Sequence, residues 1–305
     1  MTATVGVLLH GGTDRLRASG TETPRLDAEL LLGFVLGIDR TGILAHPDAP
    51  VGDGQAVAFE AALARRETGE PVAYVRGLKE FYGLVFTVDS RGLIPRPETE
   101  KLVELAVERV REALVGAPRA ADAPPLRIWD VGTGSGAIAV AVAVTLRRRG
   151  YGEHFRVLAS DVSRDALALA IENAVGHGMA DIIDFATGDL LAIDPPAPGP
   201  VDVLLANLPY IPSGTLPDLP VAASFEPRLA LDGGPDGLDL IRRLLGALPA
   251  ALAPTGSALL EIGADQGELL ATAVAEALPG WSARIHPDLS GLPRVAEILP
   301  PRPAS

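Results

Sequence analysis

The chain has 305 residues, of which 48% are hydrophobic and 21% are charged, a composition typical of a soluble globular protein with one large or two ordinary domains. It contains no cysteine, so disulfides, thiol nucleophiles and cysteine-ligated zinc are excluded. The formal net charge of -13 argues against a broad electrostatic surface for nucleic acid.

The N-terminus carries no basic residue ahead of its short apolar run, which argues against a signal peptide. The longest apolar stretch, at residues 137–146, is too short to span a bilayer. We therefore expect a cytoplasmic protein that has no membrane partner.

Residues 1–74 are predicted to form a small helical domain. Thr23 is a candidate N-cap, Pro24 suits the first helical position, and apolar residues then recur at helical spacing as far as Ile38. A second helix is expected near residues 55–67. Two interpretations remain open: a bundle that only stabilises the fold, and a module that docks a partner. The pattern alone favours the bundle.

Residues 75–97 are predicted to be a β-hairpin linker. Val85 and Thr87 suit a strand, and the Asp-Ser-Arg-Gly stretch at 89–92 suits a turn. A helical pattern begins soon afterwards, so we place the second domain at residues 98–305.

From residue 126 onward, short apolar strands alternate with helices, which predicts an α/β fold with an open, mostly parallel sheet covered by helices on both faces. The expected strands are 127–131, 156–159, 181–186, 201–206 and 258–262, with a final pair at 283–286 and 294–299. The expected helices lie near 137–148, 164–175, 236–248 and 266–278.

A glycine loop follows the first of these strands. Gly132, Gly134 and Gly136 alternate with Thr133 and Ser135 immediately before an expected helix. Glycine permits positive φ and a close approach of ligand to backbone, and the free N–H groups of a helix start can bind a ligand's polar end. A nicotinamide cofactor also fits this spacing, whereas the phosphate-binding loop that ends in Gly-Lys is missing from the sequence.

The next two strands also end in residues suited to a nucleoside. Asp161 follows the second strand, where a carboxylate can accept hydrogen bonds from two ribose hydroxyls. Asp189 and Leu190 follow the third strand and can supply an acceptor and an apolar wall for an adenine ring. Because ligands of open α/β sheets bind at the carboxyl ends of strands, the three strand ends together predict a nucleoside site.

The fourth strand ends in Asn207, Leu208, Pro209 and Tyr210. The asparagine oxygen can accept one N–H of a planar amino group, and the Leu208 carbonyl can accept the other. Proline fixes its own φ and favours an extended residue before it, so that this carbonyl projects outward. Tyr210 offers a flat face for a planar group. The pattern predicts a site that orients the lone pair of an amide or aromatic amine towards an electrophile.

With these motifs assembled, the chain resembles the class I S-adenosylmethionine-dependent methyltransferases, and specifically the release factor glutamine methyltransferase family. The resemblance rests on GTGSG at 132–136, on the acid after the next strand, and on Asn-Leu-Pro-Tyr. Longer blocks at residues 71–100, 225–245 and 259–267 resemble the family over nearly the whole chain and are far more specific than the glycine loop.

The resemblance implies a class I methyltransferase domain with a Rossmann-like, seven-stranded, mostly parallel sheet. It implies that the glycine loop, Asp161 and Leu190 contact S-adenosyl-L-methionine, and we assign Asp189 and Asn207 to the same cofactor site. It also implies that the residues from Asn207 to Tyr210 hold the glutamine of the Gly-Gly-Gln motif in a peptide chain release factor. The helical domain then helps to dock that factor, and we expect a monomer that contacts no nucleic acid directly.

The usual family form is Asn-Pro-Pro-Tyr, and this chain has Leu208 at the second position. Asn-Leu-Pro-Tyr also resembles enzymes that methylate adenine N6, so an N6-adenine methyltransferase acting on RNA or DNA is the alternative. A non-catalytic scaffold that binds S-adenosylmethionine is a second alternative. No metal is expected, because the five histidines show no paired ligand spacing.

Overall fold

The computed structural model describes residues 3–116 and 123–301 of the chain. The chain divides into two compact units, Met1–Leu78 with Leu219–Phe225, and Lys79–Asp218 with Glu226–Ser305. Residues 219–225 therefore belong to the first unit, although the second unit surrounds them in sequence.

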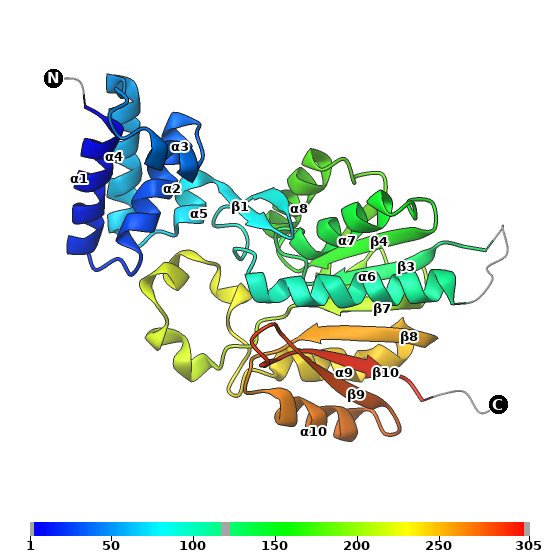
Figure 1. Cartoon of the computed structure of the whole chain (residues 1–305). Coiled ribbons are helices and arrows are strands. Elements are labelled where there is room, and N and C mark those ends of the chain that lie inside the picture. Colours follow the sequence, from blue (N-terminus) through cyan, green and yellow to red (C-terminus); the bar gives the residue numbers. More distant parts are fainter. Residues whose placement is uncertain (1–2, 117–122, 302–305) are drawn as a thin grey trace. The chain divides into compact units, whose positions relative to one another are not determined.

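The first unit is helical. Its helices are α1 (Val5–Ala18), α2 (Pro24–Leu36), α3 (Arg40–Ala45), α4 (Asp53–Glu67) and α5 (Val72–Arg76) (Figure 1). Helices α1, α2 and α4 pack on one another around buried leucines and Phe59. Gly12 allows α1 to lie close to α4, because a Cβ at this position would lie 2.8 Å from the Phe59 ring. Pro24 does begin α2, but the Thr23 hydroxyl binds the Asp27 carboxylate and caps no backbone N–H.

A short 3₁₀ helix, η3 (Val221–Phe225), completes the first unit. It approaches Gly69, where φ is +94° and a Cβ would lie 2.6 Å from Val221 Cγ1. Any larger residue at Gly69 would therefore displace this segment.

The hairpin consists of β1 (Leu78–Phe81) and β2 (Leu84–Thr87). Its turn is Tyr82–Gly83, where φ is 51° and 67°, rather than the expected 89–92. Positive φ at both central residues suits the right-handed twist of a two-residue hairpin. Asn173 of helix α8 (Arg164–Gly176) holds β2 in place: its Oδ1 accepts from the Thr87 N–H at 2.8 Å, and its Nδ2 donates to the Thr87 carbonyl at 3.0 Å.

The second unit contains a mixed sheet of the expected α/β class, in the order β6-β5-β4-β3-β7-β8-β10-β9. The strands are β3 (Leu126–Val131), β4 (Phe155–Asp161), β5 (Ile183–Asp189), β6 (Ala192–Asp194), β7 (Val201–Ala206), β8 (Leu252–Glu261), β9 (Ser282–Pro287) and β10 (Pro293–Leu299). Strands β3, β4, β5, β7 and β8 run parallel, and the other three pair antiparallel to their neighbours. The three-residue edge strand β6 is an eighth strand that the seven-stranded prediction did not contain.

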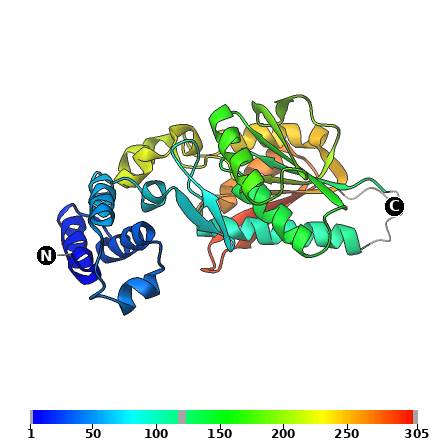
Figure 2. The ribbon, with the colours of Figure 1, turned by 90° about the horizontal axis from the view of Figure 1, so that it is seen from above.

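Helices cover both faces of this sheet (Figures 1 and 2). One layer contains α6 (Glu100–Val115), α7 (Ala137–Arg148) and α8, and the other contains α9 (Asp239–Ala251) and α10 (Gly267–Ala277). The 3₁₀ helices of this unit are η1 (Pro97–Thr99), η2 (Ser213–Asp218) and η4 (Arg228–Ala230). Within residues 3–116 and 123–301, no helix is long and apolar enough to cross a membrane.

Strand β3 has β4 on one side and β7 on the other, so the direction in which the chain adds strands reverses at this point. In open α/β sheets, the crevice outside the carboxyl ends at such a reversal is where ligands bind. At this reversal, the carboxyl ends of β3, β4 and β7 carry residues 130–136, 161 and 207, which are therefore candidates for a ligand site.

Candidate active site

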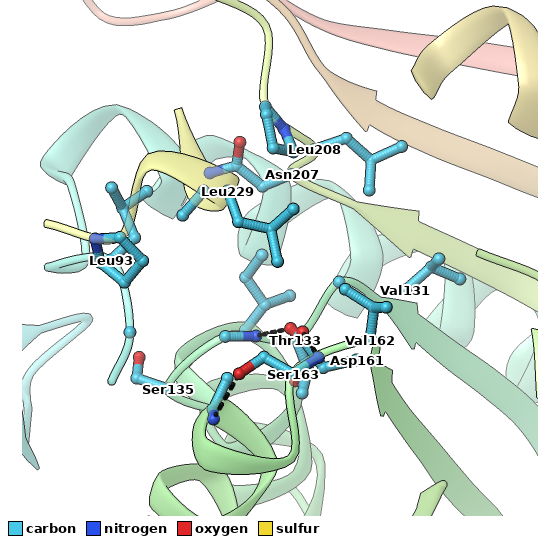
Figure 3. Close-up of a pocket in the computed structure, with 18 of the residues that line it drawn as sticks. Leu93, Val131, Thr133, Ser135, Asp161, Val162, Ser163, Asn207, Leu208 and Leu229 are labelled. Atoms are coloured by element: carbon cyan, nitrogen blue, oxygen red, sulfur yellow. Dashed lines mark hydrogen bonds between the residues drawn. The ribbon is translucent and has the colours of Figure 1, made fainter. Parts of the chain in front are cut away.

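A cavity of about 330 Å³ lies at the carboxyl ends of these strands, a size found among small-molecule sites. The predicted residues that line it are Gly132, Thr133, Gly134, Ser135, Asp161, Asp189, Leu190, Asn207, Leu208 and Pro209. Gly136 and Tyr210 are not among the lining residues. Figure 3 shows Thr133 and Asp161 at one end of this space and Asn207 and Leu229 at the other.

The three loop glycines all have positive φ, but their surroundings differ. A Cβ on Gly134 would meet no atom within 4 Å, which leaves that position open to a ligand. On Gly136 it would lie 3.0 Å from the backbone of Ala170, and on Gly132 it would lie 3.0 Å from Leu208 Cδ2. Gly136 therefore allows α7 to pack on α8, and only part of the motif serves the cavity itself.

Asp130 lies beneath the loop and is fully buried. Its Oδ2 accepts from the Thr133 hydroxyl at 2.6 Å and from the Ala139 N–H at 3.2 Å. Its Oδ1 has no partner among the described residues. Burial raises the pKa of the Asp130 carboxyl to about 7, although both hydrogen bonds oppose the rise. Asp130 was not predicted as a site residue, even though an acid near the end of a buried strand was a visible signal.

Asp161 fixes the loop from the side. Its Oδ2 accepts from the Gly134 N–H at 2.9 Å, and its Oδ1 accepts from the Ser163 N–H at 2.9 Å. Burial raises the pKa of this carboxyl, and the backbone hydrogen bonds oppose the rise. A carboxylate oxygen has capacity for a second hydrogen bond, so these contacts leave Asp161 able to bind a hydroxyl in the cavity.

Asp189 and Leu190 lie at the end of β5. Leu190 has a φ of 54°, a left-handed conformation that is rare for leucine. The Asp189 carboxylate forms an ion pair with Arg243 of α9 at 2.6 Å, and both side chains are about half exposed. Arg243 also lines the cavity and was not predicted. An exposed pair of this kind contributes little stability, so a ligand can compete for Asp189 at small cost.

Asn207 and Leu208 expose two acceptors. Asn207 Nδ2 donates to the Thr99 hydroxyl at 3.1 Å, and its Oδ1 accepts no hydrogen bond from the described residues. The Leu208 carbonyl likewise accepts none from them. The Leu208 side chain is buried in the core beside Gly132, and Leu208 also lines the cavity.

Tyr210 is partly buried and is not among the residues that line the cavity. Its hydroxyl donates to Glu261 Oε1 at 3.4 Å, and its carbonyl accepts from Gln266 Nε2 at 2.9 Å. Burial raises the pKa of the Tyr210 hydroxyl to about 12, so the side chain stays neutral and can donate.

Two further segments border the cavity and were not predicted as site residues. The first contains Arg91, Leu93, Pro95, Arg96 and Thr99, and the second contains Pro227, Leu229 and Ala230. Glu226, which is almost fully buried, joins the two segments: it forms an ion pair with Arg96 and accepts from the Ile94 N–H at 3.3 Å. Among the described residues, no group of three or more acidic or histidine side chains is arranged to hold a metal ion.

Comparison with known proteins gives matches over most of the chain. A family model described as the PrmC N-terminal domain matches residues 8–77. A release factor glutamine methyltransferase of Moorella thermoacetica is 42% identical over 282 residues, which cover 92% of this chain and 93% of the relative. The protein of the same name from Bradyrhizobium diazoefficiens is 38% identical over 290 residues, with coverage of 94% and 92%.

Among solved structures, the hMettl16 catalytic domain in complex with the MAT2A 3'UTR hairpin 6 resembles this chain with a TM-score of 0.53. The two are 15% identical, and the match covers 81% of this chain and 82% of that one. At this level of identity the likeness shows a common fold and nothing more.

Proposed function

Because the chain belongs to the release factor glutamine methyltransferase family, we propose that it transfers a methyl group from S-adenosyl-L-methionine to the side-chain amide nitrogen of a glutamine, the one in the Gly-Gly-Gln motif of a peptide chain release factor. The observation that carries the chemistry is the pair of unpaired acceptors, Asn207 Oδ1 and the Leu208 carbonyl, beside the glycine loop.

The residues around the cavity suit this cofactor. Gly134 leaves open space beside the loop, and Asp161 can accept from the ribose hydroxyls. Leu190 supplies an apolar wall, and Asp189 can accept from an adenine amino group when it separates from Arg243. Thr133, Ser135 and Asn207 complete this proposed cofactor site, while Gly136 supports it by packing.

When bound, the cofactor supplies an electrophilic methyl group. Asn207 Oδ1 and the Leu208 carbonyl each accept one N–H of the substrate amide, which directs the nitrogen lone pair away from both. The nitrogen–methyl bond forms as the sulfur–methyl bond breaks, and the amide proton leaves to solvent. Positive charge grows on the N–H groups in the transition state, so fixed acceptors stabilise it more than the ground state. Orientation can contribute on the order of 7–11 kcal/mol.

Pro209 keeps the Leu208 carbonyl free by limiting the backbone around it. Tyr210 supports this segment through the hydrogen bond that its hydroxyl donates to Glu261. We further propose that residues 1–74 help to dock the release factor, which the match to the PrmC N-terminal domain supports. The monomeric state and a cytoplasmic location remain predictions.

A methyl-transfer assay tests this function. The full-length protein is incubated with cofactor labelled on the methyl group and with a purified peptide chain release factor, and the products are digested and analysed by mass spectrometry. We expect the label on the glutamine of Gly-Gly-Gln, and none on a factor in which that glutamine is replaced by glutamate. Ribosomal RNA is tested in parallel, because Leu208 also fits the adenine alternative. Label on the RNA and none on the factor would contradict the proposal.

A further inference from the structure

Arg96, on the rim of the cavity, carries hydrogen-bond donors that the described part of the chain does not use. Its side chain is 40% exposed, and one guanidinium nitrogen donates to the Glu226 carboxylate. The other guanidinium N–H groups have no partner among the described residues. Arg91, on the same rim segment, differs because each of its guanidinium nitrogens donates to Asp89 or Glu172. Of these two arginines, Arg96 is therefore the one that can bind a ligand.

The backbone of Arg96 is fixed by its neighbours in the sequence. Arg96 lies between Pro95 and Pro97, and a residue that precedes proline favours an extended conformation, which Arg96 adopts with φ of -99° and ψ of 143°. Its carbonyl accepts from the Thr99 N–H at 3.1 Å, and the Thr99 hydroxyl accepts from Asn207 Nδ2 at 3.1 Å. Thr99 therefore links the backbone of Arg96 to the amide that is proposed to hold the substrate.

Glu226 fixes the other end of the Arg96 side chain. The Glu226 side chain is only 2% exposed, and a buried carboxylate is costly unless it is paired, so it keeps the guanidinium close. The rim around this pair also carries apolar residues, which are Leu93, Pro95, Pro227, Leu229 and Ala230. Figure 3 shows Leu229 at the end of the cavity where Asn207 lies. Apolar surroundings strengthen a hydrogen bond that the guanidinium donates to a ligand.

The proposed substrate segment needs such a donor. Two residues of Gly-Gly-Gln have no side chain, so they can be recognised only through their main-chain N–H and carbonyl groups. A guanidinium donates hydrogen bonds and accepts none, so its match in this segment is a carbonyl oxygen. The side-chain carbonyl of the glutamine is the poorer match, because a cation bound there would withdraw electron density from the nitrogen that is to be methylated. A main-chain carbonyl carries no such penalty.

We propose that Arg96 binds a main-chain carbonyl oxygen of the Gly-Gly-Gln segment, and that Glu226 is a positioning residue that directs the Arg96 guanidinium into the cavity. This inference rests on the proposed function. It divides recognition of the segment between two groups: Asn207 and Leu208 bind the glutamine side chain, and Arg96 binds the main chain beside it. Loss of Arg96 should therefore weaken substrate binding, with a smaller effect on the rate of the bound complex.

The labelled transfer assay tests Arg96 directly. In Arg96→Met we expect KM for the release factor to rise about 10- to 100-fold, while kcat and the cofactor Kd change less than about threefold. Arg242→Met is the matched control: that side chain is 42% exposed, pairs with Asp236 and is not among the residues that line the cavity. An unchanged KM in Arg96→Met, an equal rise in Arg242→Met, or a matching loss of cofactor affinity in Arg96→Met would overturn the proposal.

Two substitutions of Glu226 test its positioning role in the same assay. Glu226→Ala leaves the guanidinium without its partner and should raise KM about tenfold, again with little change in kcat. Glu226→Gln keeps an oxygen that accepts from Arg96 and from the Ile94 N–H, so it should recover part of the loss. A KM in Glu226→Ala equal to that of wild type would show that Glu226 does not position Arg96.

A binding measurement without turnover separates this inference from the proposed function. Calorimetry with protein saturated with S-adenosyl-L-homocysteine compares two release factors, one with Gly-Gly-Gln and one with Gly-Gly-Ala. A main-chain contact does not need the glutamine side chain, so Arg96→Met should weaken both by the same factor, whereas Asn207→Ala should weaken only the first. An Arg96→Met effect that disappears with Gly-Gly-Ala would overturn the proposal. The expected binding effects in a protein that methylates no factor would contradict the proposed function alone.

Discussion

The two ends of the cavity each have a buried carboxyl beside them, and the two carboxyls hold different groups. At each end, a buried carboxyl with one oxygen unpaired by the described residues accepts a hydrogen bond from a side-chain hydroxyl: Asp130 from Thr133, and Glu261 from Tyr210. Burial raises the pKa of both carboxyls to about 7. The Asp130 side chain also accepts from the backbone N–H of Ala139, whereas the Glu261 side chain holds another side chain, that of Tyr210.

The difference reflects what each end has to bind. The end of the cavity at the glycine loop, called the loop end, presents backbone groups and a carboxylate. Glycines and one acid at the end of a strand provide these groups within about thirty residues of chain. The other end, where Asn207 and Leu208 lie, is called the amide end; it presents a side-chain oxygen of Asn207, whose amide nitrogen is held by Thr99 from a distant part of the chain. A change at the first end should therefore alter cofactor affinity, and a change at the second should alter the rate.

The largest expected effect is that of Asn207→Ala. Removal of one acceptor from a growing charge should lower kcat by roughly 10²–10³-fold. The cofactor Kd, measured by calorimetry, should change less than about threefold if Asn207 acts mainly on the substrate. Asp161→Ala is the matched change at the other end and should weaken cofactor binding first. If both variants lose cofactor affinity equally, the division between the two ends fails.

A smaller effect concerns stability. A carboxyl whose pKa is about 7 in the folded state and about 4 when unfolded binds its proton more tightly in the folded state, so the free energy of unfolding falls as pH rises between those values. From pH 5 to pH 7, Asp130 alone should account for up to about 3 kcal/mol of this fall.

Asp130→Asn removes that contribution and leaves the one from Glu261. Urea unfolding at pH 5, 6, 7 and 8, followed by tryptophan fluorescence, measures it, since Trp129 lies next to Asp130 in β3. The decline in the free energy of unfolding should be shallower in Asp130→Asn and shallower still in the double variant with Glu261→Gln, in which the contribution of Asp161 remains. A decline of the same slope in wild type and the double variant would show that neither carboxyl controls it.

The smallest expected effect on activity is that of Leu208→Pro. The substrate contact proposed for this residue is a backbone carbonyl, which proline retains, so kcat/KM should stay within about threefold of wild type. The leucine side chain is buried against the core, and its loss should lower the free energy of unfolding by about 1–2 kcal/mol. A large gain of release factor methylation at the expense of RNA methylation would mean that Leu208 selects the substrate.

The sequence alone predicted the parts of the molecule that depend on local pattern. Apolar runs marked the sheet, the glycines marked the loop, and Pro24 marked a helix start. Each of these signals depends only on residues that are close together in the sequence. The short strand β6 was missed because three residues carry too little periodicity. The hairpin turn was misplaced because tyrosine seldom adopts the positive φ that Tyr82 has here.

The contacts that complete the amide end were not predictable from pattern. Thr99 and Asn207 are 108 residues apart, and Tyr210 and Glu261 are 51 apart, so nothing in either stretch signals the other. Glu261 looked like an ordinary end of an apolar strand until its burial was known. Burial and partners decide the role of a carboxyl, and both are properties of the folded chain.

The hydrogen bonds of Asn173 couple the hairpin mechanically to the glycine loop. Besides its two bonds to Thr87, its Nδ2 donates to the Ser135 carbonyl at 2.9 Å, so one amide links β2, α8 and the glycine loop. An amide offers the donor and acceptor of a peptide group, and α8 thereby holds the edge of the hairpin as a neighbouring strand would. A force that pulls on β2 must break these bonds or be transmitted to the backbone that borders the cavity. The hairpin and the glycine loop thus behave as one stiff part.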